Sequence, residues 1–145
     1  HPVERFISAY RYSVDMTARG HAHPGHPIRM LIADKGLDKS VQSFVEAIVD
    51  VDPKQLFANL HFRPQMRWIQ PGRPQFVGRH ETLSADLQRL GRFLRVDIPE
   101  SPTVVNKSRS AASVELDPDA TAFLHKLYVN DFRLLGYHRE WNQPS

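Results

Sequence analysis

The spacing of apolar residues near the N-terminus constrains the fold of this chain more than any other feature of its sequence. The residues recur at intervals of three and four positions: Val3, Phe6, Ile7, Tyr10 and Val14. Such spacing places side chains on one face of an α-helix. Pro2 suits the first helical position, where the missing N–H is not needed for a helical bond. We therefore expect a helix from about Pro2 to Met16 with one face buried in a domain.

Three further stretches show the same helical periodicity. One follows Asp38 or Ser40, stops before Pro53, and carries Val41, Phe44, Val45, Ile48 and Val49. Another carries Leu83, Leu87, Leu90 and Leu94, and the last is opened by Asp117-Pro118 and closed by Gly136. Caps of these types are typical of helix ends, so we predict three more helices.

One short stretch has strand character. Gln75-Phe76-Val77-Gly78 precedes the leucine-rich helix, and a strand that leads into a helix is typical of α/β domains. Before it, residues 59–74 mix aromatic residues, arginines and prolines, which favours an ordered but irregular segment. We predict a single α/β domain over residues 1–145, a length that suits one hydrophobic core.

Composition excludes several classes of protein. Hydrophobic residues make up 41% of the chain and charged residues 24%, so we expect a folded domain rather than a disordered one. No apolar run approaches the ~18 residues that a membrane span needs. The chain has no Cys, which excludes disulfides and thiol chemistry. The net charge of +3 comes largely from arginine, which suits a small anionic ligand better than the dense basic stripe of a nucleic-acid-binding protein.

Four segments, in order along the chain, resemble known sequence signatures. HPVERFISAYR is similar to a 3′-phosphate-binding signature through Pro2, Arg5, Ser8, Ala9 and Tyr10, and NLHFRPQ is similar to an H-x-x-P-Q element through His61, Pro64 and Gln65. FVGRHETLSADL resembles a strand-to-helix unit with an acid at Glu81, and VNKSRS with LHKLYVNDFRLLGY resembles the C-terminal end of the same proteins. The proteins concerned are the carbohydrate sulfotransferases related to the Golgi chondroitin and HNK-1 enzymes and to their bacterial relatives.

This resemblance implies a P-loop-like sulfotransferase fold, helix-rich and N-terminally truncated. It implies 3′-phosphoadenosine 5′-phosphosulfate as donor and a hydroxyl of a carbohydrate or a similar small molecule as acceptor, with no metal. The family's 5′-phosphosulfate loop would lie upstream of His1. We therefore expect residues 1–145 alone to be inactive, and poorly soluble or oligomeric, because the stripes Val3–Tyr10 and Val41–Val49 would be exposed.

The resemblance also has implications for location. Met66, Trp68 and Ile69 stand where animal members usually carry Cys, which favours a bacterial, cytoplasmic protein over a Golgi protein. Any membrane association would come from an upstream segment.

Particular residues are candidates for the chemistry. Ser8 is the expected contact of the 3′-phosphate, with Arg5 beside it, although Arg5 could instead pair with an acid. Lys107 and Arg109 lie in a polar loop that could close over the same phosphate or remain a solvated turn. His61 is the candidate base for the acceptor hydroxyl, because imidazole titrates near neutral pH, but it could equally be structural.

Two other patterns have weaker functional interpretations. Glu81 could orient a basic group, or it could cap the next helix, which is the safer interpretation. His21, His23 and His26 have metal-like spacing but no further ligand in their loop, so no metal is expected. The alternative functions are a non-catalytic module that binds a nucleotide 3′-phosphate and a basic nucleic-acid-binding protein.

Overall fold

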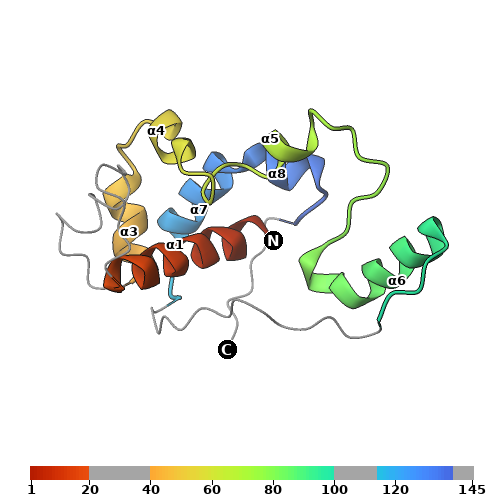
Figure 1. Cartoon of the computed structure of the whole chain (residues 1–145). Helices are drawn as coiled ribbons and strands as arrows, with labels where there is room; N and C mark the ends of the chain where they lie inside the picture. The colour runs from red at the N-terminus through yellow and green to blue at the C-terminus, as the bar shows by residue number, and fades with distance from the viewer. Residues whose placement is uncertain (20–39, 100–113, 139–145) are drawn as a thin grey trace.

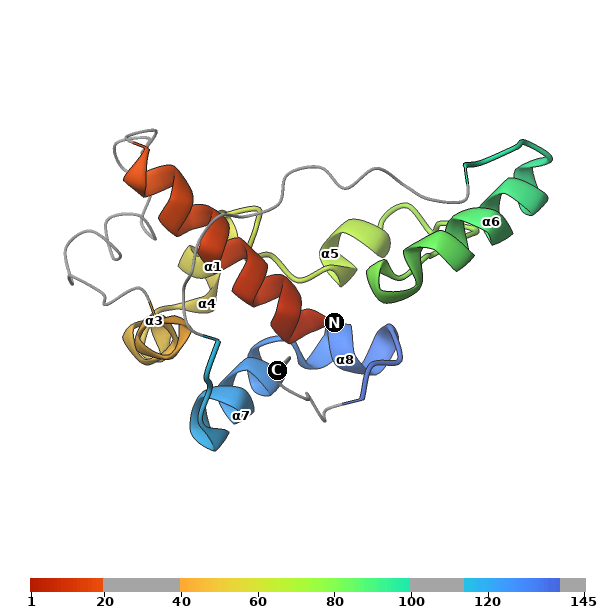
Figure 2. The ribbon, with the colours of Figure 1, turned by 90° about the horizontal axis from the view of Figure 1, so that it is seen from below.

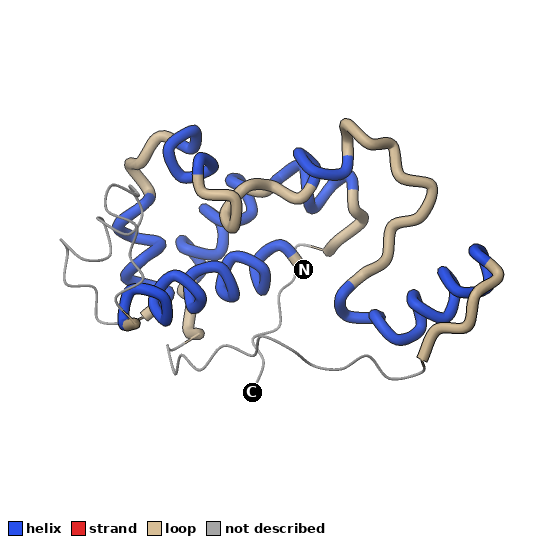
Figure 3. The backbone as a smooth tube through the Cα atoms, in the orientation of Figure 1, coloured by secondary structure: helices blue, strands red, loops and turns tan. Residues whose placement is uncertain are grey.

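The computed structural model describes residues 1–19, 40–99 and 114–138, and every regular element in these ranges is a helix (Figure 1, Figure 3). The helix-rich character that we predicted is present. The strand predicted at Gln75–Gly78 is wrong, because that segment has no regular structure. A strand needs a neighbour that pairs with its N–H and C=O groups, and no other described segment is a strand. The α/β class therefore has no support within the described residues.

The first predicted helix is confirmed as α1, Pro2–Ala18. Proline occupies its first turn, and Val3, Phe6 and Tyr10 are fully buried on one face. The helix crosses the molecule beneath α7 in Figure 1 and is seen along its whole length in Figure 2.

The second predicted helix is confirmed as α3, Val41–Ile48. The Ser40 hydroxyl caps it by accepting from the Ser43 N–H at 3.0 Å, as expected of serine at this position. The helix ends at Ile48, some residues before Pro53, and Pro53 begins α4, Pro53–Ala58, where the Asp52 carboxylate accepts from the Lys54 N–H at 2.9 Å.

An aromatic cluster joins these helices into one core. The Phe44 ring lies 5.8 Å from Phe6, 4.9 Å from Tyr10 and 5.6 Å from Phe62, measured between ring centroids. Burying each such ring stabilises the fold by roughly 1.5–3 kcal/mol. Apart from Val49, which is exposed, both apolar stripes that we expected to be exposed are therefore buried, and that expectation is wrong. The physical reason is that α1 and α3 pack against each other, Phe62 and α7, and so complete a core of their own.

The predicted C-terminal helix is two helices. It begins with Asp117, whose carboxylate accepts from the Ala120 N–H at 2.7 Å, and forms α7, Pro118–Leu127. The chain leaves helical geometry at Tyr128 and continues as α8, Val129–Leu134. Gly136 follows with φ of +67°, the left-handed conformation in which glycine commonly ends a helix.

The break at Tyr128 lets two side chains hold the chain between Phe62 and Met66. The Tyr128 hydroxyl donates to the Phe62 carbonyl at 2.7 Å. The Asp131 carboxylate, which is fully buried, accepts from the backbone N–H groups of Gln65 at 2.7 Å and Met66 at 2.9 Å. This region was predicted to be irregular, but it contains the short helix α5, Met66–Ile69, whose first N–H groups Asp131 satisfies.

The leucine-rich segment is helical, as predicted, but lies apart from the core. A 3₁₀ turn, His80–Thr82, leads into α6, Leu83–Leu94, and both ribbon views show α6 at one end of the molecule beyond α5 (Figure 1, Figure 2). Phe93 is 59% exposed and Leu94 54% exposed. These two residues thus add exposed apolar surface on α6, whereas the apolar faces of α1 and α3 are largely buried. None of the described helices has the length and apolar character to cross a bilayer.

We predict that Asp131→Ala lowers the free energy of unfolding by about 2–4 kcal/mol, because it leaves two backbone N–H donors without an acceptor. Urea unfolding at neutral pH measures the change. Asp50→Asn is the matched control, since Asp50 is exposed and should change stability by less than about 0.5 kcal/mol. Equal midpoints for the Asp131 and Asp50 variants would show that Asp131 does not hold this segment.

Candidate functional site

The exposed face of α1 carries the residues that the sequence assigns to phosphate binding. Ser8 is exposed, and Arg5 is half-buried one turn earlier. Within the described residues Arg5 makes no ion pair, so the alternative in which it pairs with an acid has no support there. A hydroxyl and a free guanidinium spaced by three positions can act on the same anion.

The Arg5 guanidinium also lies close enough to Tyr128 to affect its ionisation. Burial raises the pKa of the Tyr128 hydroxyl, while the positive charge of Arg5 opposes the rise. The phenol therefore stays protonated at neutral pH and serves as the hydrogen-bond donor to Phe62.

His61 reaches α1 through a ring contact. Its imidazole contacts the Tyr12 ring in a tilted arrangement, with centroids 4.6 Å apart and an angle of 43° between the ring planes. Tyr12 lies one helical turn after Ser8, and residues four apart on a helix are neighbours on its surface. The structure thus brings the regions of Ser8 and His61, which are distant in sequence, to one side of α1. Tyr12 was missed in the sequence analysis, and the signal that could have found it is an aromatic residue outside the apolar stripe of its helix.

The backbone of His61 is held independently of its ring. Its N–H donates to the Asn59 side-chain oxygen at 2.9 Å, and Asn59 is itself buried. The residues that follow His61 in the chain are held by the hydrogen bonds from Tyr128 and to Asp131. The His61 side chain remains exposed, so a substrate hydroxyl could approach it.

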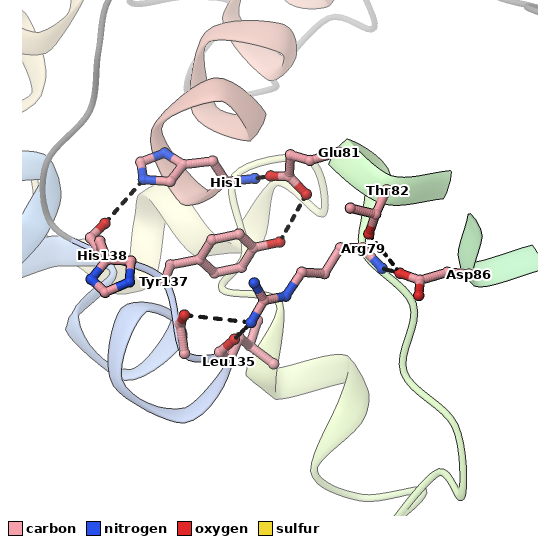
Figure 4. A network of polar contacts seen from close by, with 9 residues as sticks. His1, Arg79, Glu81, Thr82, Asp86, Leu135, Tyr137 and His138 are labelled. Carbon is pink, nitrogen blue, oxygen red and sulfur yellow. Dashed lines mark hydrogen bonds and ion pairs between the residues drawn. The ribbon is translucent and has the colours of Figure 1, made fainter. Parts of the chain in front are cut away.

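A second polar cluster joins the segment before α6 to the end of α8 (Figure 4). Arg79 donates to the carbonyls of Leu135 at 3.0 Å and Gly136 at 3.4 Å, and its guanidinium lies 5.0 Å from the centre of the Tyr137 ring. The Tyr137 hydroxyl donates to the Glu81 carboxylate at 3.2 Å, and the nitrogen of His1 also contacts that carboxylate. Three of the segments that carry the family resemblance are therefore in contact, those that contain His1, Glu81 and Tyr137.

The charges in this cluster shift each other's ionisation. Burial opposes ionisation of Glu81, but hydrogen bonds from the His1 amino group, from the Glu81 backbone N–H and from Tyr137 outweigh burial and lower the pKa of its carboxyl. Burial and the neighbouring Glu81 raise the pKa of Tyr137 to about 12. Glu81 does not cap α6 and accepts from these groups instead, so the capping interpretation is wrong. Arg79 was not singled out from the sequence.

The start of α6 is held by Asp86, which is buried. Its carboxylate accepts from the Arg79 N–H, the Thr82 hydroxyl and the Arg89 guanidinium, each at 2.8 Å. These contacts, the Arg79 N–H foremost, lower the pKa of the Asp86 carboxyl.

The remaining candidates lie outside the described residues. These are Lys107 and Arg109 of the basic loop and the three histidines His21, His23 and His26. In the ranges that are described, no three His, Asp or Glu side chains are grouped as metal ligands would be.

Comparisons with known proteins agree with the segments singled out above. A model of the Sulfotransferase family matches residues 1–138. Carbohydrate sulfotransferase 12 of Mus musculus is 31% identical over 164 residues, an alignment that covers 97% of this chain and 39% of that protein. The chain thus spans about two-fifths of the length of this relative. No solved structure matches.

We predict that Asp86 supports α6 at neutral pH and not in strong acid. Its folded-state pKa lies below the ordinary value of 3.8, so its stabilising effect is complete above that pH and is lost as the pH falls through the lower folded-state value. Amide exchange and chemical shifts of α6 should differ between the wild type and Asp86→Asn at pH 7. The exchange rates and chemical shifts of the two proteins should become the same as the pH is lowered towards 2.

Asp97→Asn is the control, because Asp97 is an exposed carboxyl just beyond α6 and should leave α6 unchanged at both pH values. A difference between the wild type and Asp86→Asn that stayed constant with pH would contradict the assigned contacts.

Proposed function

Because the chain belongs to the sulfotransferase family, we propose that the protein transfers a sulfuryl group from 3′-phosphoadenosine 5′-phosphosulfate to a hydroxyl of a carbohydrate. The proposal rests mainly on one observation: the segments that contain Ser8 and His61 are distant in the sequence, yet they lie on one side of α1. Tyr12, one turn beyond Ser8, is in ring contact with His61, so a phosphate-binding candidate and a base candidate lie near each other. The carbohydrate acceptor is favoured by the relative, which is named a carbohydrate sulfotransferase.

In this proposal Ser8 and Arg5 hold the 3′-phosphate of the donor. The exposed Ser8 hydroxyl donates to a phosphate oxygen, and the Arg5 guanidinium adds a positive charge beside it. Lys107 and Arg109 would add two more positive charges from the basic loop, as the family resemblance implies. No metal is needed where cationic side chains neutralise the phosphate.

His61 acts on the acceptor. Its neutral ring nitrogen takes the proton of the attacking hydroxyl while the oxygen forms its bond to sulfur. The bond between sulfur and the phosphate oxygen of the donor breaks, and adenosine 3′,5′-bisphosphate leaves with that electron pair. The face of Tyr12 favours the imidazolium that results, since aromatic faces attract cations. Tyr12 is thus a positioning residue and His61 the catalytic one.

The binding prediction concerns Ser8. Ser8→Ala should weaken binding of adenosine 3′,5′-bisphosphate by about 10-fold to 100-fold, because a hydrogen bond to a charged group contributes roughly 1.5–3 kcal/mol. Calorimetry on the full-length protein measures it. Ser84 is also an exposed serine, on α6, so Ser84→Ala is the matched control and should bind as the wild type does. Unchanged affinity in Ser8→Ala would remove Ser8 from the site.

The catalytic prediction concerns His61. His61→Ala should lower kcat by about 10²-fold to 10⁴-fold, the usual contribution of a general base, and leave bisphosphate affinity within about twofold, because the base contacts the acceptor. Product formation from labelled donor measures turnover. His80→Ala, an exposed histidine before α6, should be near wild type. A fully folded His61→Ala protein with normal turnover would refute this role, and a wild-type protein that binds the bisphosphate but transfers nothing would favour the non-catalytic module.

A further inference from the structure

The segment that follows His61 in the chain lines a hollow on the surface, and two of the lining side chains are cationic. The hollow measures about 470 Å³ and is lined by Arg63, Arg67, Gln70 and Pro71. The segment that forms it includes α5, the short helix that Asp131 holds at its start. The backbone under this hollow is therefore held to α8 by two partly buried hydrogen bonds.

Both guanidinium groups of the hollow are positioned by contacts that leave their charge available. Arg63 donates its Nε–H to the Phe57 carbonyl at 3.2 Å, and its guanidinium lies 5.2 Å from the centre of the Trp68 ring. The Arg67 guanidinium lies 5.4 Å from the centre of the Phe57 ring. An arginine that is already ordered loses less conformational entropy when it binds a ligand.

No acid neutralises these charges in the part of the chain that the structure describes. The ion pairs there join His1 to Glu81 and Arg89 to Asp86, and neither includes an arginine of the hollow. Two like charges that line one hollow repel each other. An oxyanion bound between them would offset that repulsion and accept from both guanidinium groups.

Trp68 adds a feature that a simple anion does not need. Its side chain is 52% exposed beside Arg63, and an exposed indole offers a flat apolar surface on which a ring can lie. Gln70, at the same hollow, offers both a hydrogen-bond donor and an acceptor. The combination suits a ring that carries a negative charge.

We propose that Arg63, Arg67 and Gln70 form an oxyanion-binding site, with Trp68 beside it, that takes a carboxylate or sulfate ester attached to a ring. The site is separate from the candidate 3′-phosphate contacts Ser8 and Arg5 on α1. Arg63 follows His61 by two residues, so the hollow adjoins the candidate base, and a charged group of the acceptor is the expected occupant. That last assignment rests on the proposed function, whereas oxyanion binding does not.

Titration of the full-length protein with inorganic sulfate, and then with phenyl sulfate, tests the site at constant ionic strength. The NMR signals of the Arg63 and Arg67 side-chain N–H groups and the Trp68 indole N–H should shift and saturate. Arg67→Gln should weaken sulfate binding by at least about tenfold, as expected for the loss of a charge-assisted hydrogen bond. Trp68→Leu should weaken phenyl sulfate binding and leave inorganic sulfate unchanged.

Arg133→Gln is the matched control, because it removes the same charge from an exposed position on α8. Arg63 also contacts the Phe57 carbonyl, so Arg63→Gln could disturb the fold, and Arg67→Gln is the decisive variant. The proposal would be overturned if the NMR shifts do not saturate with sulfate, or if the Arg67 and Arg133 variants lose sulfate affinity equally.

Steady-state kinetics identify the source of the oxyanion. If it belongs to the acceptor, Arg67→Gln should raise KM for an acceptor with a carboxylate and leave KM for its neutral counterpart unchanged. If sulfate binds at the hollow but neither KM changes, the site takes a free oxyanion. A protein that transfers no sulfuryl group would contradict the proposed function, while the sulfate titration would still decide the site.

Discussion

The contact of a buried carboxylate with two backbone N–H groups is the interaction on which the rest of this structure depends. Asp131 bonds Gln65 and Met66, and Tyr128 bonds Phe62 three residues earlier. Without these bonds the Phe62 carbonyl and the N–H groups of Gln65 and Met66 would lose the partners that Tyr128 and Asp131 supply, which is costly away from water. The same bonds place Phe62 in the aromatic core and His61 at the surface.

This arrangement explains how alternating residues of one short segment serve the core and the candidate site. The Phe62 ring is fully buried against Phe6 and Phe44. Its neighbours His61 and Arg63 turn to the surface, where His61 is in tilted ring contact with Tyr12 and Arg63 lies over the Trp68 ring. Because the core fixes Phe62, it also limits where the two flanking side chains can lie.

The region around α6 is built differently. Its capping and hydrogen-bonding contacts are polar and local, with Asp86 bonded to groups three to seven residues away, while Phe93 and Leu94 remain exposed. The Arg79, Glu81 and Tyr137 cluster connects the start of α6 to the end of α8 (Figure 4). The core around α1, α3 and α7 does not involve α6, so its stability does not depend on how the apolar face of α6 is covered.

The positions of α1, α3 and α6 and the caps of α3 and α7 were determined by the sequence alone, whereas α5, the division between α7 and α8, and the site required the tertiary structure. The stripe from Val3 to Tyr10 and the Ser40 and Asp117 caps were predictable, because they depend on neighbours three or four residues away. The break at Tyr128 was not, since it allows bonds to residues 65 and 66 positions away. The strand prediction at Gln75–Gly78 was wrong for a related reason: a strand forms only beside a partner strand, and short-range sequence patterns do not show whether one is present. Ser8 and His61 were found as motifs, but only the packing of α1 against the segment after α4 brings them together through Tyr12.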